Sequence, residues 1–319
     1  MSILDTLNNV EKTLSSPTYV EGAILTRENL DGFINRLPLK ETPIRDRLPR
    51  KTGSGLAASW NVMTTLGVGN SPFTEGWTPT EDATGYVRRS AIYKEFGKTK
   101  SITDKMLSAG KTFLEQESEQ LEVAIREIIQ DEEQFIITGD EWVSALQFDW
   151  LKVGITTNVV DDNNNALGFR PDLLNQGIEL LMTTYWVRPT AIYTGYGAQR
   201  AIDDSLSGDV RVNLNSGNEV STGLRIKSFA SMAGDLPFIN TFAIQGDSVT
   251  YGGNTVEDII IACETAQGQS VIYMEDLYGL GKADLAKTGA SIKFMVTECT
   301  VLVNRAEEFQ IQIQNVRVK

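Results

Sequence analysis

Few stretches of the sequence place residues where they could do chemistry, and one of them is similar to a calcium-binding loop. Asp161, Asn163 and Asn165 occupy alternate positions, as the oxygen ligands of such a loop do. Ala166 stands where the loop needs glycine, and Asp172 replaces the glutamate that closes the site. The stretch DDNNNALGFRPD is therefore better interpreted as an exposed polar turn than as a metal site.

Two glycine pairs could in principle approach phosphate groups. They lie in TGYGAQR and YGLGKAD, and neither completes a dinucleotide fingerprint or a phosphate-binding loop. Gly279, Gly281 and Lys282 are better interpreted as a simple turn.

Paired carboxylates and histidines offer no catalytic site either. Asp203 with Asp204, and Glu307 with Glu308, are adjacent in the chain and point in different directions on a helix or a strand. The sequence contains no histidine, which excludes serine and cysteine triads, zincin motifs and facial-triad iron sites. Enzymes can also use Asp, Glu, Lys or Tyr. We nevertheless expect a protein that is not an enzyme and has no catalytic residue, metal or cofactor.

Composition narrows the class of protein further. The 319 residues suffice for two domains or one elaborate domain, and the net charge of -13 argues against tight nucleic-acid binding, which depends on basic groups. The two cysteines, Cys263 and Cys299, exclude a disulfide framework and predict buried thiols. No apolar run is as long as a membrane span, and the first residues lack a secretory signal. We expect a soluble protein made in a cytoplasm, with no membrane partner.

A long acidic helix is predicted over residues 112–137, with a length of roughly 39 Å. Acidic residues, among them Glu119 and Glu122, greatly outnumber the bases on its polar faces. Its apolar stripe is formed by Leu114, Leu121, Ile125, Ile128 and Phe135. We call this element the spine helix.

A basic cluster precedes the predicted strands. It contains Lys40, Arg45, Arg47, Arg50 and Lys51. Three interpretations remain open: a solvated linker, a strap that pairs with acidic surface such as the spine helix, or a nucleic-acid contact that lacks stacking aromatic residues.

Residues 56–100 predict a long β-hairpin with a wide, turn-rich tip. The second strand is expected from Tyr86 onward and includes Arg88 and Arg89, whereas Phe73 and Trp77 lie at the tip. Two strands do not bury enough surface to be stable by themselves. We therefore expect the hairpin to lie across a neighbouring subunit.

The remaining segments are shorter or more mixed. Residues 1–35 predict a segmented, partly helical arm, and residues 170–206 predict helix, strand and helix. Strands dominate from residue 208, and the chain ends in two long β-runs separated by residues 304–308. A terminal pair this regular is expected to join a sheet.

The order of these parts resembles the major capsid proteins of tailed bacteriophages, with the Hong Kong 97-type fold. The hairpin FTEGWTPTEDATGYVRRSAIYKEFGKTKSIT runs directly into TDKMLSAGKTFLEQESEQLEVAIREIIQDEEQFIITGD, as an extended loop precedes a spine helix in that family. RPTAIYTGYGAQRAID is similar to a central-domain strand and helix, and KFMVTECTVLVNRAEEFQIQI to the closing strands. The resemblance is one of layout and covers most of the chain.

The resemblance implies an α+β fold with defined parts. These are an N-terminal arm over 1–50, an extended β-hairpin loop over 51–100, a peripheral domain over 101–165 with the spine helix at 112–137, a mixed α/β axial domain over 166–290, and closing strands of the peripheral domain over 291–319. The residues expected at contacts between subunits are Arg45, Arg47, Arg50, Phe73, Trp77, Arg88, Arg89, Glu119 and Glu122.

The implied function is that of a structural subunit. Hexamers and pentamers of the chain would form an icosahedral head shell that encloses double-stranded DNA without sequence-specific binding, in a virion assembled in the host cytoplasm. The implied partners are a separate scaffolding protein, because the arm is short, together with a portal and a decoration protein. Residues 53–93 contain no lysine, so a shell without isopeptide cross-links is expected.

Two alternatives belong to other classes. An encapsulin-like nanocompartment would share the fold and enclose protein cargo. A carboxylate enzyme, or another virion component such as a tail or decoration protein, would not form a shell. For the shell, reversal of two strap arginines to glutamate is expected to block assembly and leave the monomer folded.

Overall fold

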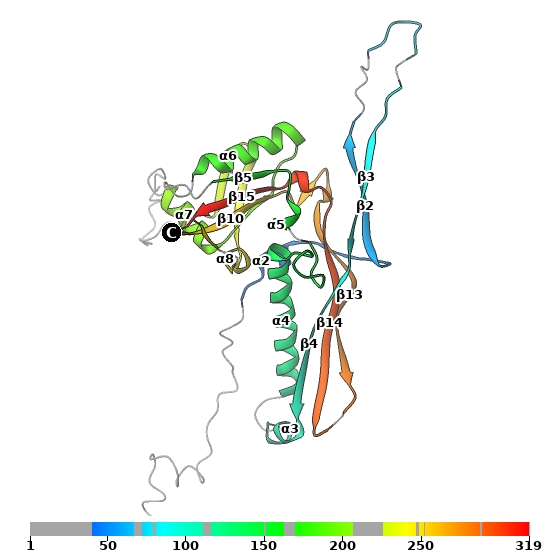
Figure 1. Ribbon diagram of the computed structural model, residues 1–319, viewed down its shortest axis with the longest axis vertical. Coiled ribbons are helices and arrows are strands. Elements are labelled where there is room, and N and C mark those ends of the chain that lie inside the picture. The colour runs from blue at the N-terminus through cyan, green and yellow to red at the C-terminus, as the bar shows by residue number, and fades with distance from the viewer. Residues whose placement is uncertain are drawn as a thin grey trace, which may run out of the picture.

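The computed structural model describes residues 40–66, 72–78, 81–110, 116–149, 151–162, 170–206, 226–246, 249–251, 253–287 and 289–318. Figure 1 shows two β-sheet bodies, a long helix that runs along one of them, and a two-stranded hairpin that extends away from both. The arm predicted over residues 1–35, and most of the polar turn at 161–172, lie outside the described residues. Within the described residues, no helix is both long and apolar enough to cross a membrane.

The first body, which we call the spine sheet, carries the long acidic helix. Its four strands are, in spatial order, β1 (Arg50–Thr52), β13 (Ile272–Leu285), β14 (Ser291–Asn304) and β4 (Lys94–Thr103). β1 is parallel to β13, and the other neighbours are antiparallel. Helix α4 (Gln116–Thr138) lies along the sheet, and its Ile128 and Ile136 share one core with Phe294 and Val296 of β14. This amphipathic packing is what the apolar stripe of the spine helix predicts.

The second body contains a seven-stranded sheet. Its order is β5–β15–β10–β6–β8–β7, with β9 paired to β10. The strands are β5 (Val159–Asp161), β6 (Ala191–Thr194), β7 (Ser228–Ser231), β8 (Gly234–Asn240), β9 (Val249–Tyr251), β10 (Asn254–Ala262) and β15 (Ile311–Arg317). β6 is buried throughout, as expected for a central strand that is covered on both faces.

Helices pack on the second sheet at close range. They are α6 (Pro171–Leu180), its π-helical continuation η1 (Leu181–Tyr185), α7 (Tyr196–Leu206) and α8 (Phe242–Gly246). Pro171 begins α6, where the missing N–H has no helical partner to lose. Gly177 allows α6 to approach the sheet, because a methyl group there would lie 2.9 Å from Ile261 Cδ1 and 3.4 Å from Ile311 Cδ1.

The predicted hairpin is present, but its second strand is shorter than expected. β2 (Ala57–Thr65) pairs antiparallel with β3 (Gly85–Ile92), in a register that joins Ala57 to Ile92 and Met63 to Tyr86. The strand then breaks at Tyr93, whose buried hydroxyl donates a hydrogen bond to the Glu275 carboxylate. Beyond this anchor the chain enters β4 and pairs with β14. The boundary expected at residue 100 therefore falls inside a strand of the spine sheet.

The two C-terminal strands join different sheets. β14 lies in the spine sheet and β15 in the second sheet, and a short 3₁₀ turn, η2 (Glu307–Phe309), separates them. Buried Gln310 fixes the crossing: its side chain accepts a hydrogen bond from the Cys263 amide at 2.7 Å and donates one to the Cys263 carbonyl at 3.1 Å. Both cysteines are buried free thiols, as predicted. The sequence range expected for the axial domain also supplies β13 to the spine sheet, so the two bodies interleave along the chain.

The other short elements connect these bodies. They are α2 (Pro43–Arg47), α3 (Asp104–Gly110), α5 (Leu151–Gly154), β11 (Thr265–Ala266) and β12 (Gln269–Ser270).

Candidate assembly surfaces

The basic strap, defined here as residues 42–52, lies across the C-terminal half of the spine helix (Figure 1). Glu133 holds its start, because its carboxylate accepts hydrogen bonds from the backbone N–H groups of Ile44 at 3.3 Å and Arg45 at 2.7 Å. Thr241 donates a third hydrogen bond to Glu133 at 2.7 Å. Burial raises the pKa of Glu133 although these hydrogen bonds act in the opposite direction. Glu133 thus caps α2 from another part of the chain.

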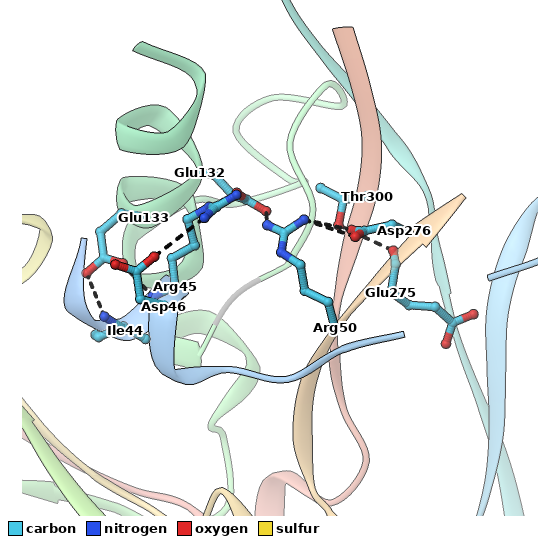
Figure 2. Close-up of polar contacts among 9 residues, drawn as sticks. All are labelled: Ile44, Arg45, Asp46, Arg50, Glu132, Glu133, Glu275, Asp276 and Thr300. Carbon is cyan, nitrogen blue, oxygen red and sulfur yellow. Dashed lines mark hydrogen bonds and ion pairs between the residues drawn. The ribbon is translucent and has the colours of Figure 1, made fainter. Parts of the chain in front are cut away.

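Glu132 binds two guanidinium groups of the strap. Its side chain is 0% exposed, and it forms ion pairs with the Arg45 Nε and with an Arg50 Nη. The second Nη of Arg50 lies 3.0 Å from both carboxylate oxygens of Asp276 on β13. Figure 2 shows Arg50 between Glu132 and Asp276, so one side chain ties the spine helix to the spine sheet. A buried carboxylate requires such pairing, because an isolated buried charge is very costly.

Arg47 extends the strap to the second body. Its Nε lies 2.5 Å from Glu264 Oε1, which also accepts a hydrogen bond from the Tyr193 hydroxyl at 2.6 Å. Burial, followed by the charge of Glu264, raises the pKa of Tyr193 well above its ordinary value. The predicted pairing of the strap with the spine helix is therefore observed for Arg45 and Arg50, whereas Arg47 binds a different acid. A role of these three arginines between subunits stays a prediction.

Glu119 and Glu122, expected at contacts between subunits, are not the acids that bind the strap within the chain, and their role between subunits stays a prediction. Glu119 and Glu122 lie near the start of α4, about 15 Å or more along the helix from the strap, and Glu122 pairs with Arg126 at 3.5 Å. The sequence did contain a signal that could have identified Glu132 as the acid that binds the strap. Glu132 lies four residues from both Ile128 and Ile136, so it shares the buried face of the helix.

Among the residues that the structure describes, the hairpin contacts the rest of the chain at its base. Trp60 donates a hydrogen bond from Nε1 to the Arg305 carbonyl at 3.1 Å, and Arg89 pairs with Glu308 at 2.5 Å. Arg88, on the next position of β3, is exposed. At the tip, Phe73 and Trp77 are 59% and 76% exposed. Both tip aromatics therefore leave most of their surface exposed to solvent.

A second apolar surface, which the sequence did not reveal, follows the spine helix. Trp142, Val143 and Leu146 are 94%, 79% and 80% exposed. Their loop is nevertheless held by hydrogen bonds, since Asp140 accepts the Trp142 N–H at 2.7 Å and Lys94 donates to the Ala145 carbonyl at 2.7 Å. Behind it lies a groove of about 290 Å³, whose apolar lining includes Phe96, Ile128, Phe135 and Leu146.

The residues first considered for chemistry have structural contacts instead. Asp162 pairs with Arg170 at 2.8 Å, Lys282 pairs with Glu117 at 2.6 Å, and Asp203 accepts the Ile226 N–H at 3.0 Å. Glu307 accepts hydrogen bonds from Thr156 and Thr157. Among the described residues, no cluster of three or more Cys, Asp or Glu side chains is arranged to hold a metal ion.

A long hairpin fixed at its base, a spine helix along a four-stranded sheet and a separate mixed α/β body together define a protein with the Hong Kong 97-type shell fold. The chain belongs to the SU10 major capsid protein family, whose family model matches residues 7–315. It is thus a major capsid protein, the subunit that forms a phage head shell. The predicted α+β fold and capsid function are confirmed.

Solved structures share the fold at low sequence identity. The capsid of a native GTA particle is 10% identical with a TM-score of 0.68, and the match covers 95% of this chain and 99% of that chain. A structure from Gordonia phage Cozz is 12% identical with a TM-score of 0.62, covering 94% and 95%. The SrpI encapsulin of Synechococcus elongatus is 12% identical with a TM-score of 0.64, covering 96% and 98%. Curated proteins gave no match. Because an encapsulin shares the fold, it is the family model that identifies the chain as a capsid protein.

Proposed function

We propose that the hairpin of β2 and β3 drives assembly by lying across a neighbouring copy of the chain. The observation that carries this proposal is the exposure of both of its faces. Met63 and Tyr86 are exposed on one face and Val87 on the other, beyond the base that Trp60 fixes. A solitary two-stranded ribbon is marginally stable in water. Burial of its apolar residues on another copy would supply the missing stabilisation.

The two bodies then take separate roles. We assign the spine sheet with α4 to the peripheral domain and the second sheet with its helices to the axial domain. Hexamers and pentamers of this subunit form the closed shell, which encloses double-stranded DNA. The net charge of -13 supports a wall that does not bind the packaged DNA tightly. A separate scaffolding protein, a portal and a decoration protein complete the head, which assembles in the host cytoplasm.

The test removes the aromatic tip. Phe73→Ser with Trp77→Ser is expected to abolish shell formation, measured by sedimentation and negative-stain microscopy of the expressed full chain. The unfolding midpoint of the subunit should stay nearly unchanged, because both side chains are mostly exposed in the subunit. The matched control is Trp186→Ser, which removes an exposed tryptophan from the second body. Normal shells from the tip variant would refute the proposal.

The content of purified particles distinguishes a phage capsid from an encapsulin-like nanocompartment. Particles purified from infected cells are expected to contain DNA, measured by ultraviolet absorbance and nuclease protection. Particles that contain one enzyme and no DNA would instead support a nanocompartment.

A further inference from the structure

Glu298 is a buried carboxylate in the centre of the spine sheet. It lies on β14, directly opposite Phe96 of β4, so the two side chains share one face of the sheet. Phe96 packs against Phe135 of the spine helix with ring centroids 5.3 Å apart, so this face is turned toward α4. Glu298 is 1% exposed, and neither carboxylate oxygen has a hydrogen-bond partner among the described residues. A buried polar group in this state requires an explanation.

The charged groups that act most strongly on Glu298 come from four of the elements around it. They are Glu132 of α4, Arg45 of α2, Arg50 of β1 and Asp276 of β13. Both arginines already pair with Glu132, and Arg50 also pairs with Asp276. With Glu298 included, three carboxylates outside the strap face its two guanidinium groups, and Asp46 of the strap itself lies 3.5 Å from Arg45. Without counting Asp46, which moves with the strap, a proton on Glu298 balances these charges, and its loss leaves one surplus negative charge.

These surroundings place the ionisation of Glu298 near neutral pH. Burial, followed by the charge of Glu132, raises the pKa of Glu298 to about 7, whereas Arg50 and Arg45 lower it. The two arginines belong to the strap, and Glu298 belongs to the sheet beneath it. Each arginine therefore stabilises the ionised form of Glu298, and by linkage the ionised form must stabilise the docked strap equally.

We propose that Glu298 is a proton-binding site that makes docking of the strap on the spine helix depend on pH. With Glu298 ionised, the carboxylates of Glu132, Asp276 and Glu298 all attract the strap arginines Arg45 and Arg50. With Glu298 protonated, its attraction is lost and the strap opens more often. Opening of the strap also removes the cations that oppose protonation, while Glu132 stays beside Glu298. Strap opening is therefore accompanied by proton uptake: it increases as the pH falls toward the docked-state pKa of about 7 and levels off below it.

The pH dependence of strap opening has the opposite direction to the pH dependence that Glu298 gives to global unfolding. In the unfolded chain the carboxyl returns to its ordinary pKa, below the folded value. The folded state then binds the proton more tightly, so this contribution to stability is complete below the ordinary pKa and is lost as the pH rises past about 7. A local opening that grows in acid, and a global stability that falls in base, have different causes and can be measured separately.

Hydrogen exchange of the full-length subunit tests the proposal. Amides of residues 44–48 are followed by mass spectrometry from pH 6 to pH 8, after correction for intrinsic exchange. Strap opening should increase as the pH falls, by no more than about tenfold per unit, the limit for one proton. In Glu298→Gln, the part of the pH dependence that comes from Glu298 should be lost, and opening near pH 8 should rise toward the wild-type value at pH 6; any dependence that remains belongs to Glu133.

The control replaces a comparable carboxylate far from the strap. Glu257 is 4% exposed, and burial raises its pKa, but its partner is the Ala198 N–H of α7. Glu257→Gln should leave the pH dependence of the strap unchanged. Strap opening that is flat or increases with pH in the wild type would overturn the proposal, and so would an unchanged dependence in Glu298→Gln. The wild-type result can overturn the proposal even if a variant folds poorly, whereas support for it needs the altered pH dependence of Glu298→Gln, because Glu133 also holds the strap and burial raises its pKa.

Discussion

The ion pairs of Glu132 offer a direct test of how the strap is held. Arg45→Met keeps the length of the side chain and removes one of two guanidinium groups from a fully buried carboxylate. Removing one partner of a buried ion pair costs about 3–5 kcal/mol. Because Arg50 still faces Glu132, we expect the low end, a loss of about 3 kcal/mol in the free energy of unfolding.

A set of further variants separates the pair from simple loss of packing. Arg45→Met with Arg50→Met deprives Glu132 of both cations, and we expect a loss of about 5 kcal/mol. Adding Glu132→Met removes the isolated charge, and apolar replacement of a buried ionic group is often neutral or stabilising. The triple variant should therefore recover most of the loss. The control, Arg126→Met, breaks an exposed pair with Glu122 and should cost less than about 1 kcal/mol.

Urea unfolding of dissociated full-length subunits, followed by circular dichroism, measures these differences. An Arg45→Met loss no larger than that of Arg126→Met would refute the reasoning, and so would a triple variant as unstable as the double.

The geometry also changes the expectation for charge reversal in the strap. Glutamates at positions 45 and 50 would face buried Glu132, so we now expect the reversed subunit to lose its fold as well as its assembly.

Three further predictions concern other contacts. Gly197→Ala should lower the melting temperature measured by calorimetry, because the added methyl group would overlap the Glu257 carboxylate, whereas Gly154→Ala meets no neighbouring atom and should not. Glu307 is partly buried, which by itself raises its pKa, but hydrogen bonds from two threonines lower it overall. Its stabilisation is therefore lost as the pH falls through the folded pKa, and Glu307→Gln should flatten acid unfolding curves. Shells boiled in detergent should give one subunit band, and a ladder of cross-linked subunits would contradict a non-covalent shell.

The hairpin and the spine helix were predictable because their signals are local. Alternation and turn residues mark a strand pair, and a stripe with helical spacing marks α4, observed from Gln116 to Thr138. The exposed tip was predictable for the same reason, since Phe73 and Trp77 lie among glycine, proline and polar residues. Each of these features is decided by residues that are close in the sequence.

The features that could not be predicted from the sequence depend on contacts between residues far apart in the chain. The break at Tyr93 depends on Glu275, which lies 182 residues away, and the separation of the last two strands depends on Gln310 and the distant Cys263. The composition of the strap showed that it would bind acids, but not that the acids would be Glu132, Glu264 and Asp276. Glu298 stands among apolar residues in MVTECTVLV, yet only the packing shows that it lacks a hydrogen-bond partner.

The distribution of charge and apolar surface predicts how assembly responds to salt. The strap arginines pair within their own chain, whereas the exposed surfaces at Trp77 and Trp142 are apolar. Contacts between copies should then depend mainly on apolar burial, which salt does not screen, while a net charge of -13 makes the copies repel one another. At 1 M salt the Debye length falls to about 3 Å, so this repulsion largely disappears. We expect assembly, measured by light scattering, to be favoured as sodium chloride rises from about 0.05 M to about 0.5 M, because the Debye length shortens over this range. Dissociation of shells over that range would show that ion pairs between subunits, and not apolar contacts, hold the shell together.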